Sequence, residues 1–322
     1  MRVRALFSGL LLAAASCAAL AQDYPAKPIH VIIPYSAGSV AEVLFRILMP
    51  VLEPALGQRF ILDARPGANG NIGMAEAARA APDGYTLVFA PTANFAVVQF
   101  LYKDLGFDPL GSFEPITMVA ENYPLCTVGP GVPARSLKEL GDYVRAHPGK
   151  YNYGSQGTGS PTHLLGASFS QLNGNSMVHV PFKGTPQMMQ ALLSGDIQVT
   201  FASVTAVLAQ IKAGKLHALA VMGRQRQPEL PDLPTTVEAG YPQLVMSNWW
   251  VLAAPKGTPA PIVDRLSKEV RAALANANVL KRYSELGHVP GSLSPAQTVA
   301  FIRSEAQRFK GIVEAGNIKV EQ

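Results

Sequence analysis

Short apolar runs alternate with helical patterns along most of this chain, and that alternation limits the folds it can adopt. Strand-like runs are expected at residues 29–34, 60–62, 86–90, 177–180, 197–201, 218–221 and 245–253. Between them, apolar residues recur at helical spacing, as at Leu44, Leu48 and Leu52. Continuous apolar strands separated by helices are typical of parallel sheets covered by helices on both faces. The sequence therefore predicts an α/β fold built on mainly parallel sheets.

The pattern restarts near Tyr123, which favours a second structural unit. A capping box at residues 136–139 opens a new helix there. After the 245–253 run, two late helices suit a return of the chain to the first unit. Pro50 falls inside the first helix and predicts a kink. A chain of 322 residues is long enough for about two domains.

The first residues have the pattern of a secretory leader. Arg2 and Arg4 precede an apolar run at residues 5–15, and the sequence Ala-Leu-Ala ending at Ala21 fits the small-residue rule for cleavage. We therefore expect a signal peptide over residues 1–21, removed after Ala21, and an exported, periplasmic protein. Cys17 also permits a lipidated form, a weaker interpretation because alanine stands three residues earlier, where leucine is usual.

Residues 152–165 read as a strand end, a loop of small polar residues and a helix start. Ser160 is a suitable N-cap and Pro161 suits the first helical position. A glycine-rich loop that leads into a helix N-terminus directs free N–H groups and the positive end of the helix dipole at one point. This pattern favours an anion site, although a plain strand-to-helix turn would look the same. The residues expected to form the site are Ser155, Gln156, Gly157, Thr158, Gly159 and Ser160.

The motifs of several other function classes are missing from the sequence. The net charge of +5 comes from scattered basic residues without interleaved aromatics, which argues against nucleic-acid binding. No two histidines stand three or four residues apart, and no HExxH, GxSxG, P-loop or SxxK motif occurs. We expect no catalytic residue, metal or cofactor, although a Ser-His-Asp triad assembled from distant positions stays open. His163, in the first turn after the loop, is either a ligand contact or a packing or capping residue.

Eight short segments, taken in order and spacing, resemble the Bug family (TctC-like) of periplasmic solute receptors of tripartite tricarboxylate transporters. The resemblance extends over nearly the whole chain after the leader. The segments are residues 24–29, 65–73, 81–87, 152–155, 178–184, 211–216, 230–235 and 254–259.

This resemblance implies a two-lobed periplasmic-binding-protein fold (Venus-flytrap), with two crossings between lobes near Tyr123 and Ser247. The first lobe would comprise residues 22–122 and 247–322, and the second residues 123–246. The family implies a monomer that captures a small organic carboxylate, using backbone N–H groups, small hydroxyls and water. The cargo would pass to the membrane subunits of a tripartite tricarboxylate transporter.

The resemblance also implies which loops line the cleft. Besides the 155–160 loop, with His163 and Phe182, these are the loops after the 29–34 and 86–90 strands and the turn after Phe201. Their candidate residues are Tyr35, Ser36, Ala37, Ser39, Val40, Thr92, Asn94, Phe95 and Ser203. At least one of Trp249 and Trp250 is expected near the hinge or cleft.

The chain departs from the family pattern where acidic residues are usual. The loop at residues 37–42 lacks the usual pair of glycines and following Asp, and Ala202 and Ser203 stand where the family often has Asp. An acidic cleft residue suits an amino group, so its absence favours a plain di-, tri- or aromatic carboxylate. Two alternatives remain: a receptor that signals to a membrane sensor kinase, and an exported hydrolase.

Overall fold

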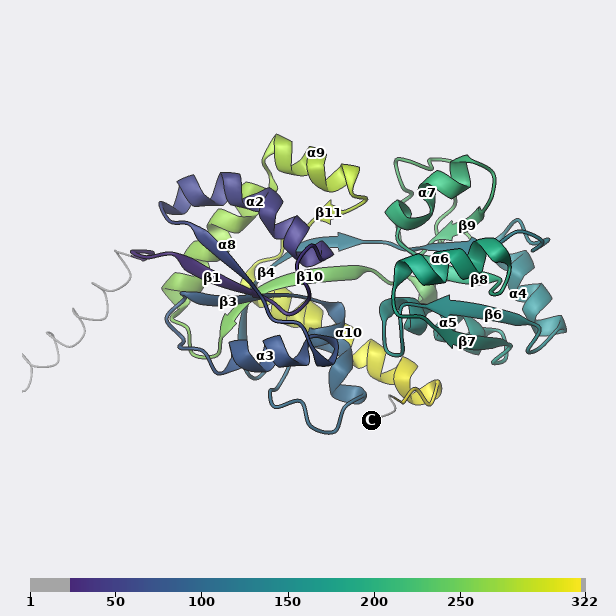
Figure 1. Cartoon of the computed structure of the whole chain (residues 1–322), viewed down its shortest axis with the longest axis horizontal. Coiled ribbons are helices and arrows are strands. Elements are labelled where there is room, and N and C mark those ends of the chain that lie inside the picture. Colours follow the sequence, from purple (N-terminus) through teal and green to yellow (C-terminus); the bar gives the residue numbers. More distant parts are fainter. Residues whose placement is uncertain (1–23, 320–322) are drawn as a thin grey trace, which may run out of the picture.

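The computed structural model describes residues 24–319, so the leader and its cleavage site lie outside the described residues. The fold has two lobes, each a sheet flanked by helices, joined by strands that run from one lobe to the other (Figure 1). The six-stranded sheet has the order β11-β4-β10-β3-β1-β2, and the five-stranded sheet has the order β7-β6-β8-β5-β9. The two-lobed α/β class expected from the sequence is confirmed.

The elements of the six-stranded lobe come from both ends of the described chain. Its strands are β1 (Ile29–Ile33), β2 (Phe60–Ala64), β3 (Thr86–Pro91), β4 (Phe113–Asn122), β10 (Asn248–Pro255) and β11 (Val289–Pro290). Its helices are α2 (Val40–Leu56), α3 (Asn71–Ala78), α8 (Ala260–Leu274), α9 (Ala277–Glu285) and α10 (Pro295–Ala315), with the short helical turns η1 (Ala68–Gly70), η2 (Ala93–Val97) and η3 (Val98–Phe100). Three late helices therefore follow β10, where the sequence predicts two.

The elements of the five-stranded lobe form one continuous stretch. Its strands are β5 (Leu125–Val128), β6 (Tyr151–Ser155), β7 (Met177–Pro181), β8 (Val199–Ala202) and β9 (His217–Val221). Its helices are α4 (Leu137–Ala146), α5 (Pro161–Leu172), α6 (Thr185–Ser194), α7 (Val204–Lys212) and the turn η4 (Pro242–Leu244).

Both sheets are mixed: β1–β4 point one way and β10 and β11 the other, and β6–β9 point one way and β5 the other. The pairs β1–β2, β1–β3, β6–β7 and β6–β8 are parallel, whereas β10 is antiparallel to β3 and β4, and β5 is antiparallel to β8 and β9. The antiparallel strands are the ones next to the crossings between lobes. A chain that leaves a lobe along β4 and returns along β10 must reverse its direction. Neither β4 nor β5 was among the strands expected from the sequence.

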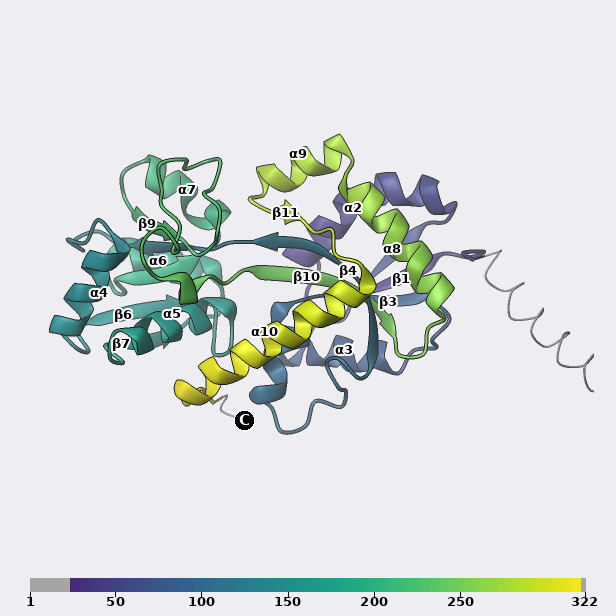
Figure 2. The same cartoon turned by 180° about the vertical axis from the view of Figure 1, so that it is seen from behind.

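The two crossing segments lie side by side between the lobes (Figures 1 and 2). Asn122, the last residue of β4, pairs with Asn248, the first residue of β10. Side chains on the two faces of β10 enter different cores. Trp249 packs in the core that reaches α10, whereas Trp250 packs in the core beneath α2 and α8.

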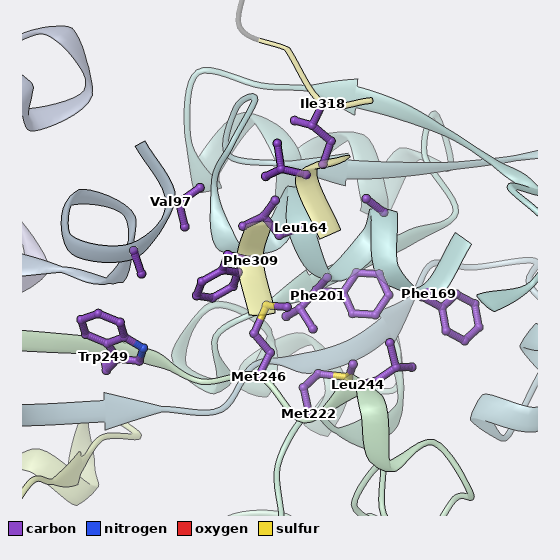
Figure 3. Close-up of a cluster of buried hydrophobic side chains, with 14 of the residues drawn as sticks. Val97, Leu164, Phe169, Phe201, Met222, Leu244, Met246, Trp249, Phe309 and Ile318 are labelled. Atoms are coloured by element: carbon purple, nitrogen blue, oxygen red, sulfur yellow. The ribbon is translucent and has the colours of Figure 1, made fainter. Parts of the chain in front are cut away.

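Helix α10 connects the lobes on the face opposite α2 and α9 (Figure 2). Its buried residues Ile302, Ala306, Phe309 and Val313 follow the 3-4 spacing that predicts one apolar face. They belong to a core shared with Leu164 of α5 (Figure 3). The Gln171 side chain on α5 donates a hydrogen bond of 3.3 Å to the backbone oxygen of Ile312. The end of α10 therefore packs on the second lobe.

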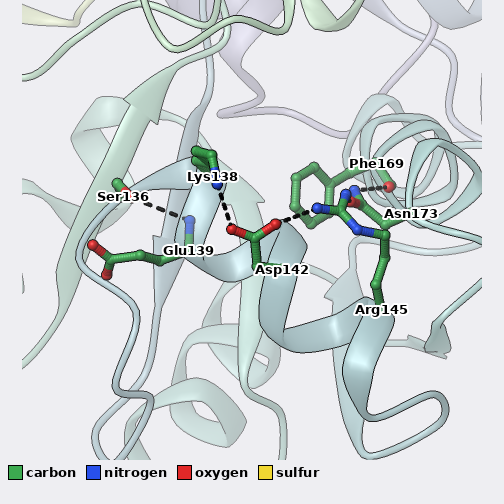
Figure 4. A network of polar contacts seen from close by, with 7 residues as sticks. All are labelled: Ser136, Lys138, Glu139, Asp142, Arg145, Phe169 and Asn173. Atoms are coloured by element: carbon green, nitrogen blue, oxygen red, sulfur yellow. Dashed lines mark hydrogen bonds and ion pairs between the residues drawn. The ribbon is translucent and has the colours of Figure 1, made fainter.

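Local capping explains where α4 begins. The Ser136 hydroxyl accepts the Glu139 N–H at 3.1 Å, as the capping box predicts, but the Glu139 carboxylate accepts the N–H of Arg135. Farther along α4, Arg145 contacts Asp142 and the Asn173 side chain at the end of α5 (Figure 4). Helix α2 continues from Val40 to Leu56 through Pro50.

Candidate functional site

A cavity of about 280 Å³ lies between the two lobes. Its lining comes from the ends of β1, β3 and β10 and the start of α2 in the first lobe, and from the 155–161 segment of the second. Of its lining residues, all of which the structure describes, none carries a charged side chain. They are Tyr35, Ser39, Val40, Ala41, Asn69, Pro91, Ala93, Gln156, Ser160, Pro161, Asn248 and Trp250.

A larger groove of about 540 Å³ lies elsewhere, along β9. Its lining residues, such as Arg135, His217 and Glu229, all belong to the second lobe. Opening or closing of the lobes would leave it unchanged. The inter-lobe cavity is therefore the candidate site for a receptor of this architecture.

The N-terminus of α2 forms one wall of the cavity. Its N-cap residue Ser39 makes no capping hydrogen bond, and the buried Ser39 Oγ has no partner within residues 24–319. In the same described part of the chain, no hydrogen bond uses the N–H groups of Val40, Ala41 or Glu42. These free donors coincide with the positive end of the helix dipole. This wall can therefore hold an anionic oxygen without a charged side chain.

Glu42, near this wall, is fully engaged on its own side of the helix. Its carboxylate accepts the Gly38 N–H at 2.7 Å and pairs with the Arg46 guanidinium, with a shortest contact of 2.6 Å. The Gly38 hydrogen bond, followed by that from Arg46, lowers the pKa of Glu42. The carboxylate is thus ionised and neutralised locally, and its contacts hold the loop that precedes α2.

Tyr35 and Asn69 form a second wall. The Tyr35 hydroxyl donates to Asn94 Oδ1 at 2.9 Å, and Asn94 Nδ2 donates to the backbone oxygen of Asn69 at 3.1 Å. The turn needs unusual backbone: Asn69 has φ 55°, and Gly70 has φ 90° with Asn94 Nδ2 only 2.8 Å from where a Cβ would lie. Burial raises the pKa of Tyr35, so its hydroxyl stays protonated.

The glycine-rich loop forms the opposite wall, but most of its N–H groups are already paired inside the loop. This corrects the expectation that the loop offers a row of free donors. The partners are Thr162 Oγ1 for Gln156, Ser155 Oγ for Gly157, His163 Nδ1 for Gly159, the Gly157 oxygen for Ser160 and Ser160 Oγ for His163. Among hydrogen bonds within residues 24–319, none uses the N–H of Thr158 or Thr162. The short polar side chains that favour a turn here also consume its donors.

The structure brings some of the predicted site residues together at the cavity and places the others elsewhere. Those that line it are Tyr35, Ser39, Val40, Gln156 and Ser160. Those that are buried are Thr92, Asn94, Phe95, Ser155, Gly159 and His163, and those that neither line the cavity nor are buried are Ser36, Ala37, Gly157, Thr158, Phe182 and Ser203.

The buried members have structural partners. Thr92 Oγ1 accepts the Trp249 N–H at 2.8 Å and so ties β3 to β10, while Phe95 packs against Phe113 and Trp249. Ser203 is the N-cap of α7, and its hydroxyl lies 3.2 Å from Thr205 Oγ1.

Sequence analysis missed several lining residues. Asn69 lies inside one of the segments that carry the family resemblance, and the unusual backbone of its turn could have indicated it. Trp250 was expected only as one of two candidates; Trp250 lines the cavity, whereas Trp249 is fully buried. The remaining missed residues are Ala41, Pro91 and Asn248, whereas Ala93 and Pro161 lie within the 92–95 and 155–163 loops that were expected to line the cleft.

Ser155 and His179 have the geometry of a nucleophile and its base, with Oγ and Nε2 2.6 Å apart. Other features argue against hydrolytic chemistry. Ser155 is fully buried and does not line the cavity. Within residues 24–319, no carboxylate forms a hydrogen bond or ion pair with His179.

Comparison with known proteins identifies the family to which this chain belongs. The model of the "Tripartite tricarboxylate transporter family receptor" matches residues 44–318. The chain belongs to this receptor family. It is 33% identical over 316 residues to "Protein BugT" of Bordetella pertussis, covering 97% of each chain.

Two solved structures agree with this assignment. "R. palustris Rpa4515 with adipate" has a TM-score of 0.80 at 30% identity, and "Structure of periplasmic binding protein BugD" has a TM-score of 0.76 at 32% identity. Each match covers 92% of this chain and 100% of the other. Bug and TctC-like proteins are periplasmic solute-binding receptors. Within residues 24–319, no helix combines the length and apolar character needed to cross a bilayer.

Proposed function

We propose that this protein captures a small organic carboxylate in the inter-lobe cavity and delivers it to the membrane subunits of a tripartite tricarboxylate transporter. The observation that carries this proposal is the start of α2, where free N–H groups and the unpartnered Ser39 hydroxyl meet at the cavity. The N-terminus of α5, at Ser160 and Pro161, lines the same cavity from the other lobe. Two helix N-termini on opposite walls favour an anion. The similar structure of Rpa4515 with adipate, a dicarboxylate, supports this ligand class.

The uncharged lining favours a carboxylate without an amino group. A buried ammonium group needs a carboxylate or several acceptors to offset its desolvation. The lining offers the side-chain oxygens of Asn69, Gln156 and Asn248 but no carboxylate. Val40, Ala93 and Trp250 contribute apolar surface for a hydrocarbon part. The ligand is thus a di-, tri- or aromatic carboxylate.

In this proposal, the protein works as a periplasmic monomer after removal of residues 1–21. Its lobes are residues 22–122 with 247–322, and residues 123–246. Sheet membership supports these boundaries, because β1–β4, β10 and β11 form one sheet and β5–β9 form the other. Helix α10 is counted with the first lobe, although its end packs on α5.

A thermal-shift series tests the proposed function. Mono-, di-, tri- and aromatic carboxylates and amino acids would be added to the mature protein. A ligand at about 100 times its dissociation constant stabilises the folded state by about 2.7 kcal/mol, which such a series detects. We expect carboxylates to raise the melting temperature and amino acids to leave it unchanged. Stabilisation by amino acids alone would contradict the proposal.

A further inference from the structure

Two histidines from different elements stack face to face behind the glycine-rich loop. His163 is in the first turn of α5, and His179 is in the middle of β7. Their ring centroids are 3.7 Å apart and their planes differ by 5°. The Tyr153 ring of β6 packs beside both, at centroid distances of 6.2 Å and 5.1 Å. Neither histidine lines the inter-lobe cavity.

Each ring is hydrogen-bonded to one end of the loop. The Gly159 N–H donates to His163 Nδ1 at 3.0 Å. His179 Nε2 shares a hydrogen bond of 2.6 Å with Ser155 Oγ, which also accepts the Gly157 N–H at 3.1 Å. The two rings therefore hold the segment between Ser155 and Gly159 from behind.

The front of the same loop faces the cavity and the other lobe. Gln156 and Ser160 line the cavity. A Cβ built on Gly159 would lie 2.3 Å from Leu101 Cδ1 of the first lobe, so the backbone of Gly159 directly abuts that side chain. The position of the loop thus determines both the cavity wall and a contact between the lobes.

We propose that His163 and His179 act as a pair of positioning residues, which hold the 155–160 loop in its ligand-binding and lobe-contacting shape. The inference has two parts. The effect of the histidines on ligand binding (the ligand half) rests on the proposed function, whereas their effect on the shape of the loop (the loop half) rests on the geometry alone. Neither ring lines the cavity, so their action on the ligand is indirect. His179 was not among the residues that the sequence singled out.

The pair can do this only while His163 is neutral. Nδ1 must be unprotonated to accept the Gly159 N–H, because a proton there would face another donor. Burial, and secondarily the His179 ring, lowers the pKa of His163 to about 3; burial lowers that of His179 to about 4. Tyr153 is the titratable group that packs against both rings. Within the described chain, no Asp, Glu, Lys or Arg contributes to either shift.

Two substitutions of His163 distinguish the effect of its hydrogen-bond acceptor from the effect of its bulk. In His163→Asn, the amide oxygen can occupy the place of Nδ1 and accept the Gly159 N–H, but the side chain cannot be protonated. In His163→Leu, the bulk remains and the acceptor is lost. His147→Asn is the matched control, because His147 is an exposed histidine of the same lobe, outside the loop.

The first measurement needs no ligand. Amide hydrogen exchange of Gly159, followed by NMR, should be at least tenfold faster in His163→Leu than in the wild type. It should stay within about threefold of the wild type in His163→Asn and His147→Asn. Equal exchange in the wild type and His163→Leu would overturn the positioning role.

The second measurement is calorimetric titration with adipate at pH 7. We expect His163→Leu to bind at least tenfold more weakly than the wild type at pH 7. His163→Asn should bind like the wild type. Wild-type affinity in His163→Leu would overturn the ligand half. A wild type that binds neither adipate nor any other carboxylate would overturn the proposed function and the ligand half together, while the Gly159 exchange rates would still decide the loop half.

Discussion

Gly159 of the second lobe lies directly against Leu101 of the first lobe. The 2.3 Å between a Cβ built on Gly159 and Leu101 Cδ1 is far below any real carbon–carbon contact. From sequence, this glycine was expected to allow close approach of an anion. The structure shows that it also allows close approach of the two lobes. A side chain at this position therefore acts on the contact between lobes.

Gly159→Ala should separate the lobes and weaken ligand binding about tenfold, equivalent to about 1.4 kcal/mol. The added methyl group meets Leu101, and the backbone at φ 79° is strained for alanine. Small-angle scattering should give a larger radius of gyration, and calorimetry should give the lower affinity.

Gly157→Ala is the control for strain. Its φ is 117°, but the nearest atom to its Cβ, the Phe182 oxygen, is 3.8 Å away. Leu101→Ala, added to Gly159→Ala, should restore much of the affinity. An effect of Gly157→Ala as large as that of Gly159→Ala, without rescue by Leu101→Ala, would show that strain alone is responsible.

Ligand binding should change the emission of Trp250 and leave that of Trp249 nearly constant. Trp250 lines the cavity, whereas Trp249 is fully buried between Phe95 and Phe301. Fluorescence titration of two single-tryptophan variants with a carboxylate that binds the protein tests this assignment. Trp250→Phe should abolish the ligand response and Trp249→Phe should keep it; the reverse pattern would place the ligand elsewhere.

Ser39→Asp should weaken carboxylate binding more than tenfold. A second negative charge would stand beside the ligand at the α2 N-terminus, where like charges at about 4 Å repel by about 4 kcal/mol at an effective dielectric constant of 20. Ser39→Ala, which removes only one donor, should cost about 1 kcal/mol of binding. Isothermal titration calorimetry measures both.

Ser203→Asp provides the matched comparison. The sequence alone favoured this position for an effect on carboxylate binding, but Ser203 is the N-cap of α7 and does not line the cavity. We expect a change in affinity of less than about threefold, because aspartate is also a good N-cap. A larger loss at Ser203 than at Ser39 would show that the ligand contacts the α7 turn.

Stability should fall as the pH drops from about 6.5 towards 4. The folded-state pKa values of His163 and His179 lie below the usual value, so in this window the unfolded chain binds protons that the folded chain does not. Each histidine then lowers the free energy of unfolding by about 1–2 kcal/mol between pH 6.5 and 5. Urea denaturation at pH 7 and pH 5 measures the difference. His163→Asn should reduce the pH dependence; an unchanged slope would mean that His163 does not titrate in this way.

The local elements were largely predictable from sequence. Periodicity placed most strands and helices, Ser160 and Pro161 indicated the start of α5, and eight short segments indicated the receptor family. At the site, the loop after β1 and the 155–160 loop, both expected from sequence to line a cleft, contribute residues to the same cavity. These signals are local because they depend on neighbours within one turn or one strand.

The tertiary structure alone decided the direction of the strands, the side of the sheet to which each side chain points, and the acceptors with which the backbone N–H groups pair. β10 pairs with β3 and β4, which precede it by more than a hundred residues, so no local pattern shows that it runs antiparallel. Its alternating faces send Trp249 into the core and Trp250 to the cavity only once those neighbours are in place. His179 reaches the glycine loop because β6 and β7 pair in parallel, and the loop then uses its N–H groups on its own side chains. The sequence alone determined most of the local elements and the receptor family. Which backbone donors stay free for the ligand was decided by contacts between residues far apart in the chain, since each donor can serve only one strong acceptor at a time.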